Sequence, residues 1–292
     1  MKRRELLLIG AGAFSGIVFP NKFWKYDDEN EWLNRLAALE KQTGGRLGVA
    51  VLDTGSDEKL LYRGDERFPM CSTFKLLLVA HILSRVDASH EQLSRVISYG
   101  ENDLLEYAPI TRKNLVSGGM TVSALCEAAI TVSDNTAANL LLQNSGGPKG
   151  LTSYLRTIGD HTTRLDRIEP KLNSALPGDP RDTTTPNAMA ATMRKLLVDK
   201  TLSSPSRQLL IGWLEACTTG SEKLRAGLPS SWRVGDKTGS GAHGSSNDVA
   251  IVWPANQKPV LITAYLSQTG PSAELNKAFA DVGRIAADWI GK

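Results

Sequence analysis

A serine stands three residues before a lysine where a long apolar run begins. Ser72 follows Pro69, and the run after it is typical of a buried helix. Residues three apart share a helix face, and a hydroxyl at a helix N-terminus lies near the positive end of the dipole. Lys75 is therefore a candidate to remove the Ser72 proton, if burial or charge lowers its pKa. The spacing alone carries little weight, because Ser56 and Lys59 repeat it in an expected hairpin turn.

A second short motif, Ser133-Asp134-Asn135, lies between two segments with helical apolar spacing. There the Ser133 hydroxyl can relay a proton, and the Asn135 amide can bind a substrate carbonyl. Asp134 is placed to cap the helix that follows. A plain helix N-cap explains the same three residues, so this motif alone assigns no function.

A third motif, Lys237-Thr238-Gly239, stands at the end of a predicted strand. The edge of a strand offers backbone N–H and C=O groups to an extended ligand. The Lys237 ammonium and the Thr238 hydroxyl suit a carboxylate. Taken by itself, the motif is equally compatible with a strand that runs into a glycine turn.

Together and in this order, the three motifs resemble those of class A serine β-lactamases, within the penicillin-recognising serine hydrolases. The resemblance extends over residues 30–291, and three runs strengthen it: "MTVSALCEAAITVSDNTAANLLL", "RLDRIEPKLNSALPGDPRDTTTP" and "WRVGDKTGSG". It implies hydrolysis of the β-lactam amide of penicillins and cephalosporins through a serine acyl-enzyme, which gives antibiotic resistance. It implies no cofactor.

The resemblance places a second catalytic group in a polar, proline-rich loop. Glu169 and Asn173 match the glutamate and asparagine that hold a water between them in the family. An acyl-enzyme ester needs an activated water to turn over, and a positioned general base contributes about 10²- to 10⁴-fold in rate. The family also implies a cis bond between Glu169 and Pro170, and an ion pair between Arg167 and Asp182 that clamps the loop.

The mechanism implied by the resemblance has two steps. Ser72 attacks the lactam carbonyl, while the backbone N–H groups of Ser72 and Ser240 form the oxyanion hole. Ser133 passes a proton to the leaving nitrogen, and Glu169 then directs water onto the ester. Whether Lys75, or Glu169 through water, is the base for acylation is left open by the sequence.

The family resemblance also bears on how the substrate is bound. Tyr107 resembles the aromatic residue at the mouth of the family's site. Many members place an arginine near the substrate carboxylate, but Ser246 and Asn276 stand at the corresponding positions here. We predict that Lys223 or Lys277 supplies the missing charge.

Two residues near the third motif bear on the range of substrates. Ser240 and Thr238 suggest that cephalosporins, including oxyimino-cephalosporins, are substrates. Carbapenem hydrolysis is not expected. Members with that activity commonly join a cysteine at the Cys71 position to one at the position of Gly241.

The chain has three cysteines, Cys71, Cys126 and Cys217. An odd number leaves at least one unpaired. The resemblance goes further, since the family partner of Cys71 is Gly241, and a partner for Cys126 would stand at Val79. We therefore predict three free thiols.

The overall composition is that of a soluble globular protein that acts on small molecules. The 292 residues carry a net charge of +3, with 41% apolar and 22% charged residues. No basic block suggests nucleic acid. The four histidines form no close cluster, so a metal site is not expected. We expect a monomer.

The N-terminus reads as an export signal. Lys2-Arg3-Arg4 precedes an apolar segment, residues 6–20, that is too short to cross a bilayer comfortably. Adjacent arginines before leucines are typical of the twin-arginine route. We predict a signal over residues 1–26 and a periplasmic or secreted protein, free of the membrane once the signal is removed. An uncleaved membrane anchor is the alternative.

Apolar periodicity predicts a helix, strands, many helices, strands and a helix, in that order. The predicted helices are 31–41, 73–86, 122–131, 135–143, 150–158, 186–198, 205–217 and 273–290; the predicted strands are 46–52, 59–63, 232–238, 248–253 and 260–266. This order predicts an α+β fold, in which an antiparallel sheet is flanked by N- and C-terminal helices. The sheet domain would comprise 27–64 and 218–292, and an inserted all-helical domain 65–217, including an active-site loop over 162–186.

Two other functions share the three motifs. A D,D-carboxypeptidase or penicillin-binding protein would hold its acyl-enzyme, and the glutamate of the loop argues against it. A β-lactam sensor would acylate once and then signal, yet the sequence shows no signalling domain after the catalytic unit. Turnover of a chromogenic cephalosporin would separate both from a β-lactamase.

Overall fold

The computed structural model describes residues 24–270 and 274–292. The predicted export signal lies outside the described residues, except that residues 24–26 begin the first helix. Residue 273, the expected start of the last helix, also lies outside them. Within the described part of the chain, no helix is both long and apolar enough to cross a membrane.

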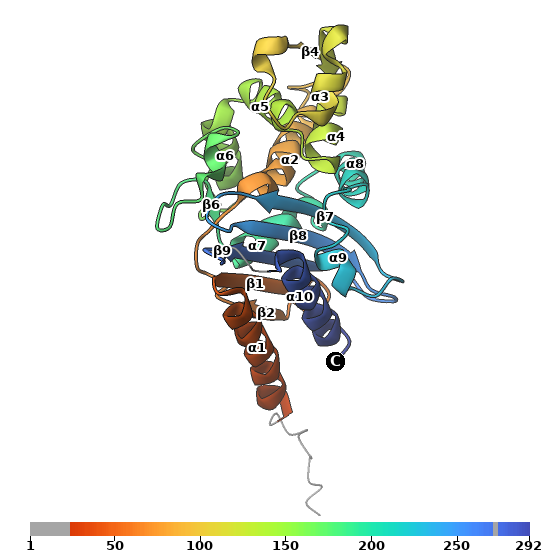
Figure 1. The fold of residues 1–292 in the computed structure, drawn as a ribbon. Coiled ribbons are helices and arrows are strands. Elements are labelled where there is room, and N and C mark those ends of the chain that lie inside the picture. Colours follow the sequence, from red (N-terminus) through yellow and green to blue (C-terminus); the bar gives the residue numbers. More distant parts are fainter. Residues whose placement is uncertain (1–23, 271–273) are drawn as a thin grey trace, which may run out of the picture.

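A five-stranded antiparallel sheet forms the middle layer of the molecule (Figure 1). Its strand order is β2-β1-β9-β8-β7. The strands are β1 (Arg46–Asp53), β2 (Lys59–Tyr62), β7 (Arg233–Ser240), β8 (Ser246–Trp253) and β9 (Val260–Ser267). Strands β1 and β9 pair along their whole length, with Val51 opposite Ile262. The two ends of the chain therefore build one sheet.

The sheet is buried on both faces, which explains why its strands read as continuous apolar runs. Side chains alternate between the faces along β1. Val49 and Val51 join one hydrophobic cluster, whereas Ala50 and Leu52 join another. The first cluster contains residues of α1 (Trp24–Thr43), α9 (Leu224–Gly227) and α10 (Leu275–Ile290). These helices cover one face of the sheet (Figure 1).

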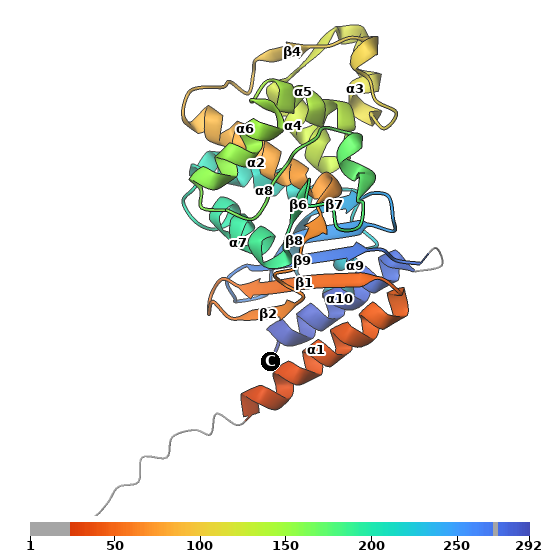
Figure 2. The same ribbon diagram turned by 90° about the vertical axis from the view of Figure 1, so that its left-hand side faces the viewer.

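A helical layer covers the other face (Figure 2). Its helices are α2 (Phe74–Asp87), α3 (Pro109–Lys113), α4 (Val122–Thr131), α5 (Asn135–Gln143), α6 (Gly147–Thr157), α7 (Pro186–Leu197) and α8 (Ser204–Glu215). Helix α2 packs against α4, α5, α6 and α8. Its first ten residues are all buried, which is why its sequence is apolar on every side.

The predicted α+β fold is confirmed, and α4 and α5 begin and end at the predicted residues. Two small sheets were not predicted, because strands of two or three residues show no periodicity. One pairs β4 (Val96–Ser98) with β5 (Gly119–Thr121). The other pairs β3 (Phe68–Pro69) with β6 (Thr183–Thr184), and it holds the end of the active-site loop beside the segment that leads to Ser72. The division into domains remains a prediction.

Candidate active site

A cavity of about 380 Å³ lies where the helical layer meets the edge strand β7. Nine predicted site residues line it: Ser72, Tyr107, Ser133, Asn135, Asn173, Lys223, Thr238, Gly239 and Ser240. The other three predicted catalytic or binding residues lie buried beneath its floor. These are Lys75 and Lys237, both fully buried, and Glu169, which is 2% exposed. The structure thus brings the whole predicted set together.

Ser72 is held in a single 3₁₀ turn that leads directly into α2. The residue before it, Cys71, has φ of +45°, a conformation that is strained for a residue with a Cβ. A Cβ at Gly239 would lie 3.1 Å from Ser72 N, so glycine lets the end of β7 approach this turn. The predicted oxyanion residues, Ser72 and Ser240, therefore line one cavity.

Lys75 lies one helical turn beyond Ser72 and has several close partners. Its Nζ donates to Ser133 O at 2.8 Å and to Asn135 Oδ1 at 2.6 Å. It also forms an ion pair with Glu169 Oε1 at 3.2 Å. Burial lowers the pKa of Lys75, and the Glu169 carboxylate opposes this shift. Ser72 Oγ donates to the same Oε1 at 3.3 Å, so Glu169 contacts both the Ser72 hydroxyl and the Lys75 ammonium.

The second motif lies across the cavity from α2. Ser133 has φ of +62°, and its Oγ accepts from Lys75 Nζ at 3.2 Å and from Lys237 Nζ at 3.1 Å. One hydroxyl therefore connects the two buried lysines. Asp134 caps α5 as predicted, since its Oδ1 accepts from Ala137 N at 2.9 Å.

The third motif lies on β7, whose residues from Val234 to Gly239 are buried. Burial lowers the pKa of Lys237 to about 8. Its Nζ also donates to Thr238 O at 2.9 Å. Thr238 Oγ1 lies 2.5 Å from the hydroxyl of Thr219, which lines the cavity too. Thr219 was not predicted from the sequence, because it belongs to no motif and stands outside any predicted element.

The active-site loop carries Glu169 and Asn173 to the cavity floor. Asn173 Nδ2 donates to Glu169 Oε2 at 2.6 Å, and the Glu169–Pro170 peptide bond is cis as predicted. Asn139, on α5, holds the backbone of Glu169 through its side-chain amide, with contacts of 2.9 and 3.0 Å. Ala242 N donates to Asn173 O at 2.9 Å, so the turn after β7 also fixes the loop.

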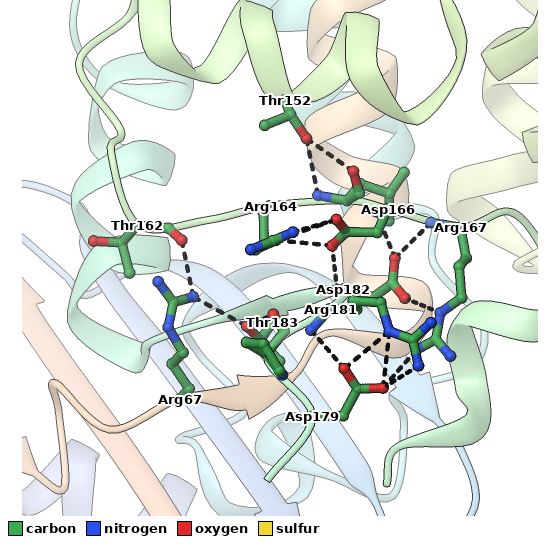
Figure 3. A network of polar contacts seen from close by, with 12 residues as sticks. Arg67, Thr152, Thr162, Arg164, Asp166, Arg167, Asp179, Arg181, Asp182 and Thr183 are labelled. Carbon is green, nitrogen blue, oxygen red and sulfur yellow. Dashed lines mark hydrogen bonds and ion pairs between the residues drawn. The ribbon is translucent and has the colours of Figure 1, made fainter.

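A network of charged side chains closes the loop upon itself (Figure 3). The predicted pair is present, with Arg167 Nε 2.5 Å from Asp182 Oδ2. Asp182 is fully buried, and its Oδ1 also accepts from the backbone N of Asp166 at 2.7 Å and of Arg167 at 2.9 Å. Every oxygen of this buried carboxylate therefore has a partner, as a buried charge requires.

Of the two lysines predicted to bind the substrate carboxylate, only one reaches the cavity. Lys223 Nζ donates to Ser246 Oγ at 2.8 Å, and Lys223 is only 7% exposed. Lys277 lies on the exposed side of α10 and pairs with Glu274 at 3.0 Å, which leaves Lys223 as the candidate of the two. Asn276 also points elsewhere, since its amide donates to Glu222. Both residues belong to the first turn of α10, and neither lines the cavity.

All three cysteines are buried free thiols, as predicted. A Cβ at Gly241 would lie 2.7 Å from Cys71 Sγ, so the expected partner position is adjacent but carries no sulfur. Burial raises the pKa of Cys71 to about 12. Among the described residues, no group of histidine, cysteine or carboxylate side chains could hold a metal ion.

Comparisons with known proteins agree with this geometry. The Beta-lactamase enzyme family matches residues 32–290. Beta-lactamase CTX-M-8 of Citrobacter amalonaticus is 47% identical over 264 residues, which is 90% of each chain. Beta-lactamase OXY-1 of Klebsiella oxytoca is 45% identical over 98% of each chain. The solved structure of an ancestral class A β-lactamase is 58% identical, with a TM-score of 0.87 over 88% of this chain and 99% of its own.

Proposed function

Because the chain belongs to the class A β-lactamases and hydrolyses β-lactams through a serine acyl-enzyme, we propose that Ser72 is its nucleophile. Ser72 Oγ attacks the lactam carbonyl from its turn at the start of α2. The N–H groups of Ser72 and Ser240 stabilise the oxyanion, where one donor is commonly worth about 10²- to 10³-fold in rate. The hydrolysis confers resistance to the antibiotic.

The acylation step uses the buried lysines on both sides of Ser133. The proton of Ser72 passes to the coupled pair of Lys75 and Glu169, which lie within 3.2 Å of each other. Ser133 protonates the leaving nitrogen and regains a proton from Lys75, whose Nζ contacts its Oγ, while Lys237 contacts the same oxygen. A cation on each side keeps this hydroxyl ready to give up its proton.

The substrate carboxylate is held at the far end of the cavity. Lys237, Thr238 and Lys223 supply positive charge and a hydroxyl there, and Ser240 extends the strand edge for the substrate. Asn135 and Tyr107 border the part of the cavity that receives the amide side chain. These residues fit penicillins and cephalosporins, with oxyimino-cephalosporins included.

One observation distinguishes a hydrolase from an enzyme that keeps its acyl group. Glu169 Oε2 accepts a hydrogen bond from Asn173 Nδ2, and the Oδ1 of Asn173 is buried without a protein partner. A buried acceptor of this kind requires a water. A water bound by these two side chains would lie near Ser72, whose Oγ is 3.3 Å from Glu169 Oε1, and Glu169 could activate it against the ester.

Glu169→Ala tests this proposal. The variant should release one equivalent of product from a chromogenic cephalosporin and then stall, with deacylation slower by about 10²- to 10⁴-fold. Mass spectrometry should find the acyl group on the peptide that contains Ser72. Glu127→Ala, an exposed glutamate on α4, is the matched control and should turn over normally. Normal turnover by Glu169→Ala would refute the hydrolytic role.

Lys223→Ala tests the carboxylate site. Loss of one charge-assisted contact should raise the KM for a penicillin by about 10- to 100-fold, with a smaller change in kcat. Lys277→Ala, which removes an exposed lysine from α10, should leave KM unchanged. An unchanged KM in Lys223→Ala would exclude Lys223 from the site.

The finer features of the chain are proposals as well. Residues 1–26 would direct export to the periplasm by the twin-arginine route, which suits a protein whose three thiols are free. The enzyme would act as a monomer without nucleic acid. Residues 27–64 with 218–292, and residues 65–217, would form two domains, since the apolar clusters lie on opposite faces of the sheet.

A further inference from the structure

A second cavity, of about 300 Å³, lies on the other side of the active-site loop from the catalytic groups. Loop residues 175–181 and Thr183 form one wall, and β1, β3 and the end of β9 form the other. No residue of this cavity lines the active site. Figure 3 shows the loop wall, with its arginine and aspartate side chains.

The cavity is rich in arginine. Arg46 and Arg67 come from the body of the protein, and Arg167 and Arg181 come from the loop. Only two carboxylates join the lining, and both are already paired: Glu66 with Arg46 at 2.7 Å, and Asp179 with Arg181 at 2.8 Å. Arg167 forms an ion pair with Asp182, which does not itself line the cavity. The remaining positive charge belongs to Arg67.

Arg67 has no ionic partner among the described residues. Its Nη1 donates to Thr162 O and to Thr183 Oγ1, both at 3.0 Å, and neither acceptor is charged (Figure 3). These bonds fix the position of the guanidinium without neutralising it. A guanidinium carries five N–H donors in a fork that matches the two oxygens of a carboxylate. Arg67 is thus a preoriented anion receptor.

The uncharged part of the lining has an apolar portion, beside the polar side chains of Thr183, Ser267 and Gln268. Pro69, Ala175, Leu176, Pro177 and Pro180 supply the apolar portion, and the side chain of Leu176 is 48% exposed at the rim. A volume of about 300 Å³ is at the lower end of the range for small-molecule pockets. We propose that this cavity binds a small organic carboxylate with an apolar body, with the carboxylate on Arg67 and the body against the prolines and Leu176.

Such a ligand would contact the loop and the body of the protein at once. Arg67 and Pro69 belong to the body, whereas Ala175–Pro180 belong to the loop that carries Glu169. A molecule that binds only the closed loop stabilises that arrangement in proportion to its occupancy. Binding there therefore stabilises the loop against local unfolding, and it leaves the catalytic cavity free for substrate, since the two cavities share no lining residue.

Titration with 3-phenylpropionate tests the proposal on the mature enzyme, followed by amide NMR shifts. We expect saturable shifts in residues 175–183, with Kd on the order of 1 mM, and slower hydrogen exchange in the same segment. The neutral amide, 3-phenylpropanamide, should bind at least tenfold more weakly. Equal binding of acid and amide would overturn the proposal.

Variants locate the site. Arg67→Gln should weaken binding by about 10- to 100-fold, as expected for loss of a charge-assisted contact. Arg207→Gln is the matched control, because Arg207 also donates to backbone oxygens, those of Asp199 and Leu202. That variant should bind like wild type. Unchanged binding in Arg67→Gln would refute the site.

Two more variants separate this cavity from the alternatives. Lys223→Ala should bind the probe normally, whereas loss of binding in that variant would place the carboxylate in the active site instead. Leu176→Asp adds a negative charge at the exposed rim, where folding is not at risk, and it should abolish binding. Normal binding by Leu176→Asp would contradict the proposal even if Arg67→Gln proved unstable.

Discussion

Two groups of charged side chains lie a few residues apart in this enzyme, yet they are built on opposite principles. The catalytic cluster is buried and has two lysines for one carboxylate: Ser72, Lys75, Ser133, Glu169 and Lys237. The loop clamp is partly exposed and matches three arginines with three aspartates: Arg164, Asp166, Arg167, Asp179, Arg181 and Asp182. The catalytic cluster therefore carries buried charges that are not balanced within it, whereas each charge of the loop clamp has a partner of opposite sign.

The pKa shifts follow this difference. In the catalytic cluster, burial lowers the pKa of Lys237 to about 8, and the charge of Lys75 adds to the effect. In the loop clamp, hydrogen bonds from Arg181 lower the pKa of Asp179 to about 2. The first shift shows a charge that the fold disfavours, and the second a charge that the fold stabilises. The charges of the catalytic cluster therefore reduce the stability of the fold, whereas the charges of the loop clamp add to it.

The largest expected effect comes from breaking the clamp. Asp182→Asn removes the charge of a fully buried carboxylate and leaves Arg167 without its closest partner. Loss of one partner of a buried pair typically costs about 3–5 kcal/mol. We expect the free energy of unfolding to fall by that amount, measured by denaturant titration, with faster hydrogen exchange across the loop.

The exposed pair of Asp57 and Arg194 provides the control. Asp57→Asn should change stability by less than about 1 kcal/mol, as is usual for surface pairs. If Asp182→Asn behaved like Asp57→Asn, the clamp would not be the supporting element that its burial indicates.

A second experiment tests the other half of the comparison. Lys237→Met replaces a fully buried cation by an apolar side chain of similar length. Because the pKa of Lys237 lies near 8, its protonated form is less stable in the folded than in the unfolded chain. The variant should unfold with a free energy higher by about 1–3 kcal/mol, while kcat/KM for a penicillin falls by about 10²-fold. Lys59→Met, at an exposed lysine, should change neither. Reduced stability in Lys237→Met would contradict the comparison.

The smallest effect is a dependence on pH. As the pH rises through about 8, Lys237 loses its proton and can no longer attract the substrate carboxylate. The wild-type kcat/KM for a penicillin should therefore fall about tenfold for each further pH unit. Between pH 8 and about 10.5 the unfolded chain binds more protons at this lysine, so wild-type stability should approach that of Lys237→Met. A stability difference that stayed constant over this range would assign the shift to another group.

Much of this arrangement could be predicted from the sequence. Helices α4 and α5 have the apolar spacing and the caps that define their ends, and Asp134 occupies the cap as expected. The candidate site residues were predicted because three short motifs occur in the family's order, not because any motif was specific alone. Ser56, which has the same spacing to Lys59 as Ser72 has to Lys75, lies in an exposed turn, as the turn residues around it predicted.

The remainder depended on tertiary packing. The sequence offered Lys223 or Lys277, and only the folded structure shows that Lys223 lines the cavity whereas Lys277 pairs with Glu274. Thr219 meets Thr238 through a contact of two residues that are 19 apart in the chain. Helix α3 has five residues, too few to show a period. The anion cavity joins segments from both chain ends, which no local pattern could reveal.

The pairing of β1 with β9 has a consequence for how the enzyme is made. Residues 260–267 are synthesised about 200 residues after residues 46–53, their partners at the centre of the sheet. At ribosomal speed this delay is roughly 10–40 s. Until then, β7 and β8 can pair with each other, but β8 has no partner on its other side, and the hairpin that carries Lys237 is not joined to β1. The nascent chain therefore cannot hydrolyse the antibiotic before β9, the last strand, has been synthesised and has paired with β1.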